Sequence, residues 1–180
     1  MTTVINLFGG PNSGKSTCAS GLFYFLKLKH FHCEIVREYV KSWAWEGRKP
    51  NKYDQPYIFG KQLKYESSLY DKVDFIITDS PLMLSAFYED LYEQQSIIKD
   101  AAFRFMNKAQ ENNVVYRNFW LSTVDNIDTR GRFGEEKSFV EQGHKMRDWL
   151  EKNHIKFEEV PINIDGEDRV KFLLNKITQA

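Results

Sequence analysis

The segment from Gly9 to Thr17, GGPNSGKST, constrains the fold more than any other part of this 180-residue chain. It matches G-x-x-x-x-G-K-[ST] in full and lies between an apolar, β-branched run at 3–8 and helical periodicity from 14 to 29. In such a unit, glycine N–H groups and the positive end of the helix dipole face phosphate oxygens. We therefore predict a phosphate-binding loop that contacts a nucleotide through Gly10, Pro11, Asn12, Ser13, Gly14, Lys15, Ser16 and Thr17.

The rest of the chain alternates apolar runs with helical patterns. Strands are expected at 3–8, 33–36, 73–79, 114–121 and 155–160, and helices at 14–29, 38–47, 56–71, 96–111, 136–152 and 167–178. Together with the phosphate loop, this alternation predicts an α/β, three-layer P-loop NTPase fold with a central five-stranded parallel sheet. We expect one domain over residues 1–180.

Composition limits the partners of the chain. Lysine plus arginine and aspartate plus glutamate both number 25, so no overall positive field would attract nucleic acid or an anionic membrane. Cys18 and Cys33 match neither a disulfide framework nor a metal site, which favours a reducing compartment. With neither a signal-peptide pattern nor a membrane-spanning apolar run, we expect a cytoplasmic protein, in the host cytoplasm if a phage encodes it.

Charged side chains follow the expected strands at the edge where ligands bind parallel sheets. Lys15 would reach the β- and γ-phosphates, and Ser16 together with Asp79 would hold Mg²⁺. A helix-capping role is the alternative for Asp79 because Ser-Pro follows it. Arg37 would bind the transferred phosphoryl group and Glu38 would act as general base, unless both are surface residues of a first helical turn.

Two further segments are candidates for the active site. Residues 123–136 are a charged loop in which Arg130 and Arg132 would close over the phosphates as a lid; a solvated loop is the alternative. In the loop and helix after residue 47, polar and aromatic groups suit a planar base with polar edges, although core packing explains part of this segment equally well. The substrate-binding candidates there are Tyr53, Asp54, Gln55 and Gln62.

These features together resemble a known family, the ribosylnicotinamide kinase domain of the NadR type and related small P-loop kinases, several of them from bacteriophages. The resemblance spans nearly the whole chain and rests on GGPNSGKST, REYV, YDQ with FGKQ, FIITDS, and FVEQGHKMRDWLEKNHIKFEEV. It implies a fold similar to nucleoside and nucleotide kinases, with ATP on the phosphate loop and an acceptor hydroxyl near Glu38 and Asp79. The chain departs from the family at Ile77, where NadR-like strands tend to carry an acidic residue.

Three functions are compatible with these observations. The first is ATP- and Mg²⁺-dependent transfer of the γ-phosphoryl group to a hydroxyl of a nucleoside or nucleotide. The second keeps this chemistry but uses a hydroxymethylated pyrimidine in phage DNA as acceptor, which the neutral net charge disfavours. The third is a P-loop NTPase or switch without kinase activity. ATP is expected rather than GTP because no guanine-reading motif is present, and the acceptor and the oligomeric state stay open.

Overall fold

The computed structural model describes residues 1–51, 53–92, 97–123, 136–162 and 165–178. Its central sheet has five strands in the order β2-β3-β1-β4-β5, and every neighbouring pair is parallel. The strands are β1 (Thr2–Phe8), β2 (Cys33–Val36), β3 (Phe75–Thr78), β4 (Val114–Leu121) and β5 (Glu158–Val160). This sheet confirms the predicted P-loop NTPase fold.

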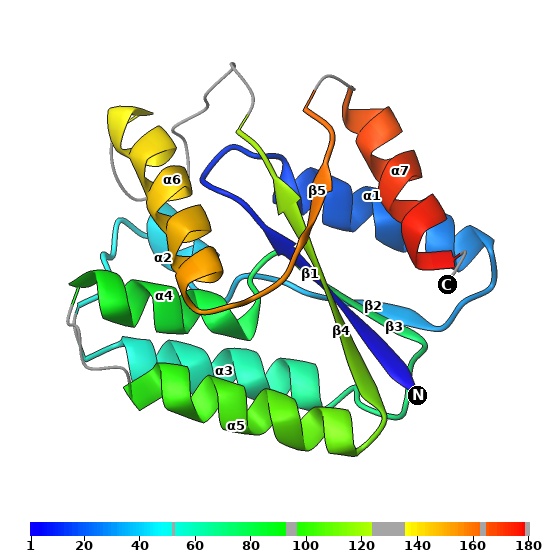
Figure 1. Ribbon diagram of the computed structural model, residues 1–180, viewed down its shortest axis with the longest axis horizontal. Helices are drawn as coiled ribbons and strands as arrows, with labels where there is room; N and C mark the ends of the chain where they lie inside the picture. Colours follow the sequence, from blue (N-terminus) through cyan, green and yellow to red (C-terminus); the bar gives the residue numbers. More distant parts are fainter. Residues whose placement is uncertain (52, 93–96, 124–135, 163–164, 179–180) are drawn as a thin grey trace.

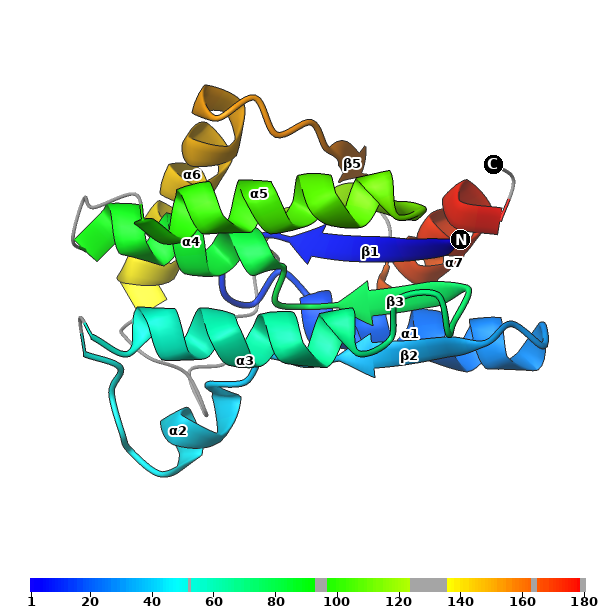
Figure 2. The same cartoon turned by 90° about the horizontal axis from the view of Figure 1, so that it is seen from below.

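Helices cover both faces of the sheet, as Figure 1 shows. Helices α1 (Lys15–Leu28) and α7 (Gly166–Thr178) pack together on one face. Helices α3 (Gln55–Ser67), α4 (Leu82–Tyr92) and α5 (Ile97–Glu111) cover the other, and Figure 2 shows α3 and α5 running along the strands. The short helix α2 (Lys41–Trp45) and helix α6 (Glu136–Lys152) lie toward the carboxyl ends of the strands. Within the described residues, no helix has both the length and the apolar character needed to cross a membrane.

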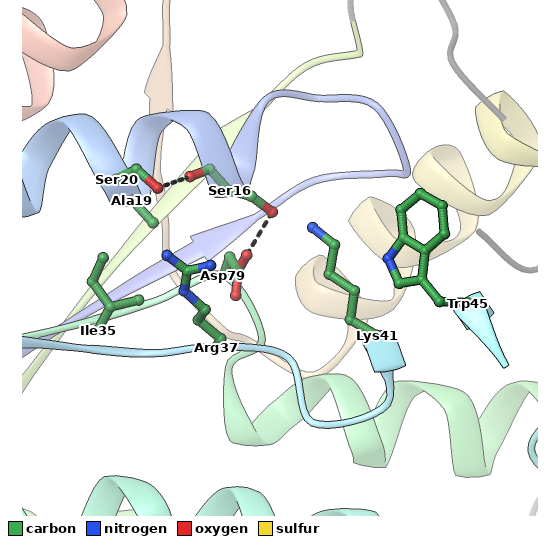
Figure 3. A pocket seen from close by; sticks show the side chains of 8 residues that line it. All are labelled: Ser16, Ala19, Ser20, Ile35, Arg37, Lys41, Trp45 and Asp79. Atoms are coloured by element: carbon green, nitrogen blue, oxygen red, sulfur yellow. Dashed lines mark hydrogen bonds between the residues drawn. The ribbon is translucent and has the colours of Figure 1, made fainter. Parts of the chain in front are cut away.

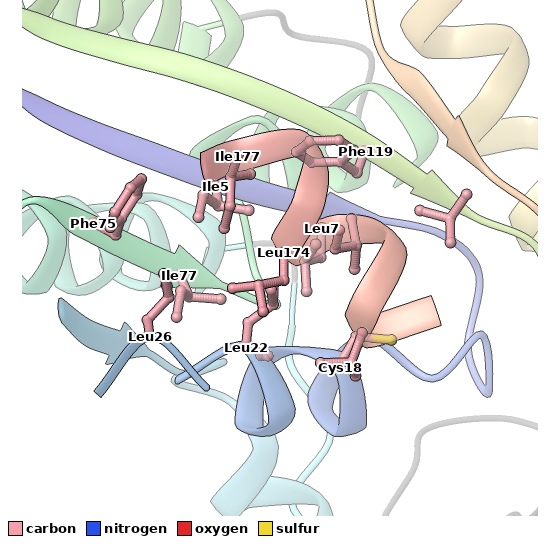
Figure 4. Packing of buried hydrophobic residues seen from close by; sticks show 14 of the residues in the cluster. Ile5, Leu7, Cys18, Leu22, Leu26, Phe75, Ile77, Phe119, Leu174 and Ile177 are labelled. Carbon is pink, nitrogen blue, oxygen red and sulfur yellow. The ribbon is translucent and has the colours of Figure 1, made fainter. Parts of the chain in front are cut away.

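Alternating strand residues supply a separate core on each face of the sheet. Ile5, Ile77 and Phe119 pack against Leu22 of α1 and Leu174 of α7, as Figure 4 shows. The intervening residues of the same strands pack with the helices on the opposite face. Burial on both faces explains why these strands read as continuous apolar runs rather than as alternating patterns.

The structure differs from the expected secondary structure at several points. Helix α4 was not predicted, because its residues from Leu82 to Phe87 are all buried among neighbouring helices and therefore carry no amphipathic period. The helix expected at 38–47 begins only at Lys41, because the chain from Glu38 onward first makes a turn. Strand β5 begins only at Glu158, later than expected, and its residues pair with the last three residues of β4.

Candidate active site

The phosphate loop leaves the end of β1 with a backbone that requires glycine. Gly9 has φ +148°, and a Cβ there would lie 2.2 Å from the carbonyl oxygen of Leu121. Gly14 has φ +84°, a left-handed conformation that is strained for other residues, and it stands immediately before α1. The loop and the first turn of α1 contain all eight residues predicted to contact a nucleotide, Gly10, Pro11, Asn12, Ser13, Gly14, Lys15, Ser16 and Thr17.

The side chain of Lys15 folds back over this loop. Its Nζ donates to the carbonyl oxygens of Gly9 at 2.7 Å and Gly10 at 2.9 Å. The lysine charge therefore lies on the loop, at the positive end of the α1 dipole. An anion bound there would be attracted by the Lys15 ammonium group and by the partial positive charge at the start of α1.

Three segments converge on the carboxylate of Asp79, directly after β3. The Ser16 hydroxyl donates to Asp79 Oδ2 at 2.6 Å, and the backbone N–H of Glu38 donates to Asp79 Oδ1 at 3.1 Å. Asp79 is 7% exposed and thereby links the phosphate loop to the chain after β2. The two residues predicted to hold a metal are therefore adjacent.

The donors at this point fit Mg²⁺. A hydroxyl and a carboxylate are hard oxygen ligands, and Mg²⁺ is usually held by one or two such groups with phosphate oxygens and waters. Among the described side chains, no group of three or more histidine, cysteine, aspartate or glutamate residues could hold a metal alone. Ser16 and Asp79 would thus bind the ion together with a nucleotide.

A cavity of about 260 Å³ opens beside the Ser16–Asp79 pair. Figure 3 shows that the cationic ends of Arg37 and Lys41 extend toward this pair, while Trp45 lies at the edge. Among the described residues, neither cation takes part in an ion pair. Arg37 was among the predicted site residues, whereas Lys41 and Trp45 were not, because they belong to no motif and only the position of α2 brings them to the cavity.

The other substrate-binding candidates lie on or before α3 and do not line this cavity. Gln62 is 2% exposed, and its Nε2 donates to Thr78 Oγ1 at 3.4 Å beside Asp79. Gln55 is also buried, and among the described residues the side-chain oxygens of both glutamines have no hydrogen-bond donor. Asp54 pairs with Arg48, and Tyr53 is 76% exposed. The structure therefore brings Gln62 near the strand ends and leaves Tyr53 on the surface.

Helix α4 adds a residue that sequence analysis missed. Burial raises the pKa of the Tyr88 phenol, and the nearby Glu38 carboxylate raises it further. The Tyr88 phenol therefore stays protonated in the neighbourhood of the predicted base. No local signal identified Tyr88, because the fully buried pattern of α4 hid the helix itself.

The predicted lid residues Arg130 and Arg132 lie outside the described residues, so their positions are not described. The helix that follows them is described. Its Gly143 lies against the phosphate loop, where a Cβ on Gly10 would come 3.0 Å from Gly143 Cα. Helix α6 therefore contacts the phosphate loop backbone directly.

Comparisons with known proteins agree with this architecture. A family model described as an AAA domain matches residues 4–169. A structure of deoxyadenosine kinase from M. mycoides with bound dATP aligns with TM-score 0.57 and 17% identity, covering 99% of this chain and 100% of that one. The same kinase with the products dCMP and a flexible dCDP aligns with TM-score 0.58 and 19% identity, covering 98% and 100%. A search of curated protein sequences finds no match.

Proposed function

The chain belongs to the AAA-domain family, and we propose that it is an ATP- and Mg²⁺-dependent phosphotransferase that moves the γ-phosphoryl group to a hydroxyl of a nucleoside or nucleotide. The observation that carries this proposal is the convergence on Asp79. The carboxylate accepts from Ser16 of the phosphate loop at 2.6 Å and from the backbone of Glu38 at 3.1 Å. Donor and acceptor groups would thereby meet at one edge of the sheet.

Most of the proposed catalysis is positioning and charge stabilisation. Bound Mg²⁺, held by Ser16 and Asp79, would neutralise charge on the phosphate oxygens. Lys15 would move from the loop carbonyls to the β- and γ-phosphates. Glu38 would accept the proton of the attacking hydroxyl, because its backbone N–H donates to Asp79 and so holds the residue beside the proposed metal site.

Positive charge around the transferred phosphoryl group would come from two places. Arg37 and Lys41 border the cavity next to the Ser16–Asp79 pair. Arg130 and Arg132 are proposed to add charge and to exclude water that would otherwise hydrolyse ATP.

The region around α3 is proposed to bind the acceptor base. The unpartnered side-chain oxygens of Gln55 and Gln62 would accept hydrogen bonds from N–H groups at the edge of a base. An aromatic cluster reaches the same helix through Tyr57, whose hydroxyl contacts that of Tyr39 at 2.8 Å, and the Tyr39 ring meets Trp43 edge-on. A nucleoside-type acceptor is also supported by the similarity in fold to deoxyadenosine kinase. Tyr53 and Asp54 are proposed to contribute at the rim of this region.

The decisive experiment incubates the protein with Mg²⁺ and γ-labelled ATP together with separate acceptors. The panel contains deoxynucleosides, their monophosphates, and duplex DNA with hydroxymethylated pyrimidines. We expect label in a nucleoside or nucleotide. Label in DNA alone would identify the alternative kinase, and label only in free phosphate would replace both kinase functions with an NTPase.

Substitution of the proposed base separates chemistry from binding. We expect Glu38→Gln to lower kcat by about 10²- to 10⁴-fold, the usual contribution of a general base, with little change in ATP affinity. Glu34→Gln, which removes an exposed carboxylate from the adjoining strand β2, is the matched control and should keep full activity. Turnover by Glu38→Gln at the rate of this control would exclude Glu38 as the base.

A further inference from the structure

Arg169 on α7 is a buried cation directly behind the phosphate loop. Its side chain is 4% exposed, and its hydrogen bonds within the described residues all go to backbone carbonyl oxygens. Nη1 lies 3.3 Å from the oxygen of Ser13 and 3.5 Å from that of Ser122, and Nη2 lies 3.2 Å from that of Ile162. One guanidinium thus joins the phosphate loop to the segments that follow β4 and β5.

The charge of this guanidinium is not balanced by a carboxylate among the described residues. The nearest acidic residues in sequence bond elsewhere, since Asp165 accepts from the backbone of Asp168, and Asp168 pairs with Lys171. Arg169 Nε is buried and has no acceptor within the described part of the chain. Because removing an ionised side chain from water costs several kcal/mol, a buried arginine with only neutral partners needs a compensating role.

The guanidinium is also close to the helix that begins in the phosphate loop. Burial raises the pKa of the Cys18 thiol on α1 to about 11, and the positive charge of Arg169 opposes that rise. Arg169 therefore acts on the same part of α1 whose dipole would face a phosphate group. No carboxylate within the described residues pairs with Arg169 and neutralises its charge.

We propose that Arg169 is a positioning residue of the phosphate loop, and that its buried charge uses the polyphosphate of the bound nucleotide as its counter-ion. In a planar trans peptide the C=O and the following N–H point in opposite directions. By holding the Ser13 carbonyl, Arg169 turns the Gly14 N–H away from itself, in the loop where such groups bind phosphate oxygens. The planar, forked guanidinium fixes the orientation of the Ser13 carbonyl, and its positive charge attracts the polyphosphate.

This inference rests on phosphate binding at the loop and not on the identity of the acceptor. The test therefore uses tripolyphosphate and Mg-ATP as probes, with dissociation constants measured by calorimetry below the unfolding temperature of each variant. We expect Arg169→Met to weaken both probes by about tenfold, the effect of losing one hydrogen bond to a charged group. Lys171→Met, an equal loss of charge at an exposed site on the same helix, should leave both constants within about twofold.

Two results with the methionine variants would overturn the inference. One is a folded Arg169→Met protein that binds tripolyphosphate as tightly as wild type, even if its unfolding temperature falls. The other is an equal loss of affinity in Lys171→Met, which would indicate that any positive charge on α7 attracts the probe regardless of its position. If Arg169→Met does not fold, Arg169→Lys keeps the charge without the fork and should weaken tripolyphosphate by about threefold; unchanged affinity there would also overturn it. Neither measurement requires turnover, so failure of the proposed kinase function would appear only in the labelling assay.

Discussion

The carboxyl group of Glu66 is expected to make the stability of this protein depend on pH. Glu66 is fully buried on α3, where its Oε1 accepts from the hydroxyls of Tyr70 at 2.7 Å and Tyr116 at 3.3 Å. Its Oε2 has no partner within the described residues. Burial raises the pKa of Glu66 from 4.5 to about 7, although the two tyrosine hydrogen bonds oppose the rise.

The direction of the effect follows from proton counting. Between pH 4.5 and 7 the folded chain keeps a proton on Glu66 that the unfolded chain has released. The free energy of unfolding therefore falls as pH rises through this window and levels off above the folded pKa. A rise from 4.5 to about 7, at about 1.4 kcal/mol for each tenfold change in proton affinity, corresponds to about 3 kcal/mol.

Glu66→Gln isolates this contribution, because glutamine has nearly the same shape and does not titrate. Urea unfolding of wild type and variant at several values from pH 5 to 8 gives the difference in unfolding free energy, from which the other titrating groups cancel. We expect the variant to gain about 2 to 3 kcal/mol relative to wild type across this range. Glu46→Gln, at an exposed glutamate, is the control and should show a constant difference. Parallel curves for wild type and Glu66→Gln would refute the reasoning.

Three other predictions concern the candidate site and its surroundings. Lys41→Gln should lower kcat/KM about tenfold through loss of a cation beside the proposed phosphoryl group, with Lys49→Gln, outside the cavity, as control; equal rates in steady-state assays would exclude the role. Gly10→Ala should weaken Mg-ATP binding measured by calorimetry. The added Cβ would lie 3.0 Å from Gly143 Cα, so the backbone of either the phosphate loop or α6 must shift. Unchanged affinity for Mg-ATP would contradict this prediction. Cys18, buried and with its pKa raised to about 11, should resist a thiol reagent at pH 8 in the folded protein and react in urea; rapid native labelling of Cys18 would contradict the packing.

Much of the fold could be predicted because its signals are local. The strands at 33–36 and 114–121 and the helix at 136–152 have the expected bounds, since apolar runs and helical periods are properties of neighbouring residues. Helix α4 could not be predicted in this way. Neighbouring elements bury it on several sides, so its apolar residues show no helical period in the sequence.

Within the candidate site, the phosphate loop and the position of Asp79 after a strand were visible in the sequence. The hydrogen bonds that join Asp79 to Ser16 and to Glu38 depend on the order of three parallel strands. The roles of Arg130 and Arg132 stay predictions. Residues such as Lys41 and Tyr88 were missed because neither belongs to a motif, and only the packing of α2 and α4 brings them to the strand ends.

The sequence by itself determined that this chain would fold as a parallel sheet with a phosphate loop after its first strand, because glycine spacing and apolar periodicity act over a few residues. Only the tertiary structure decided what surrounds that loop. Arg169 is 156 residues from Ser13 along the chain, yet its guanidinium holds the Ser13 carbonyl. A contact of this kind leaves no trace in local pattern, because it is created when α7 packs against α1 and the carboxyl ends of β1, β4 and β5 meet.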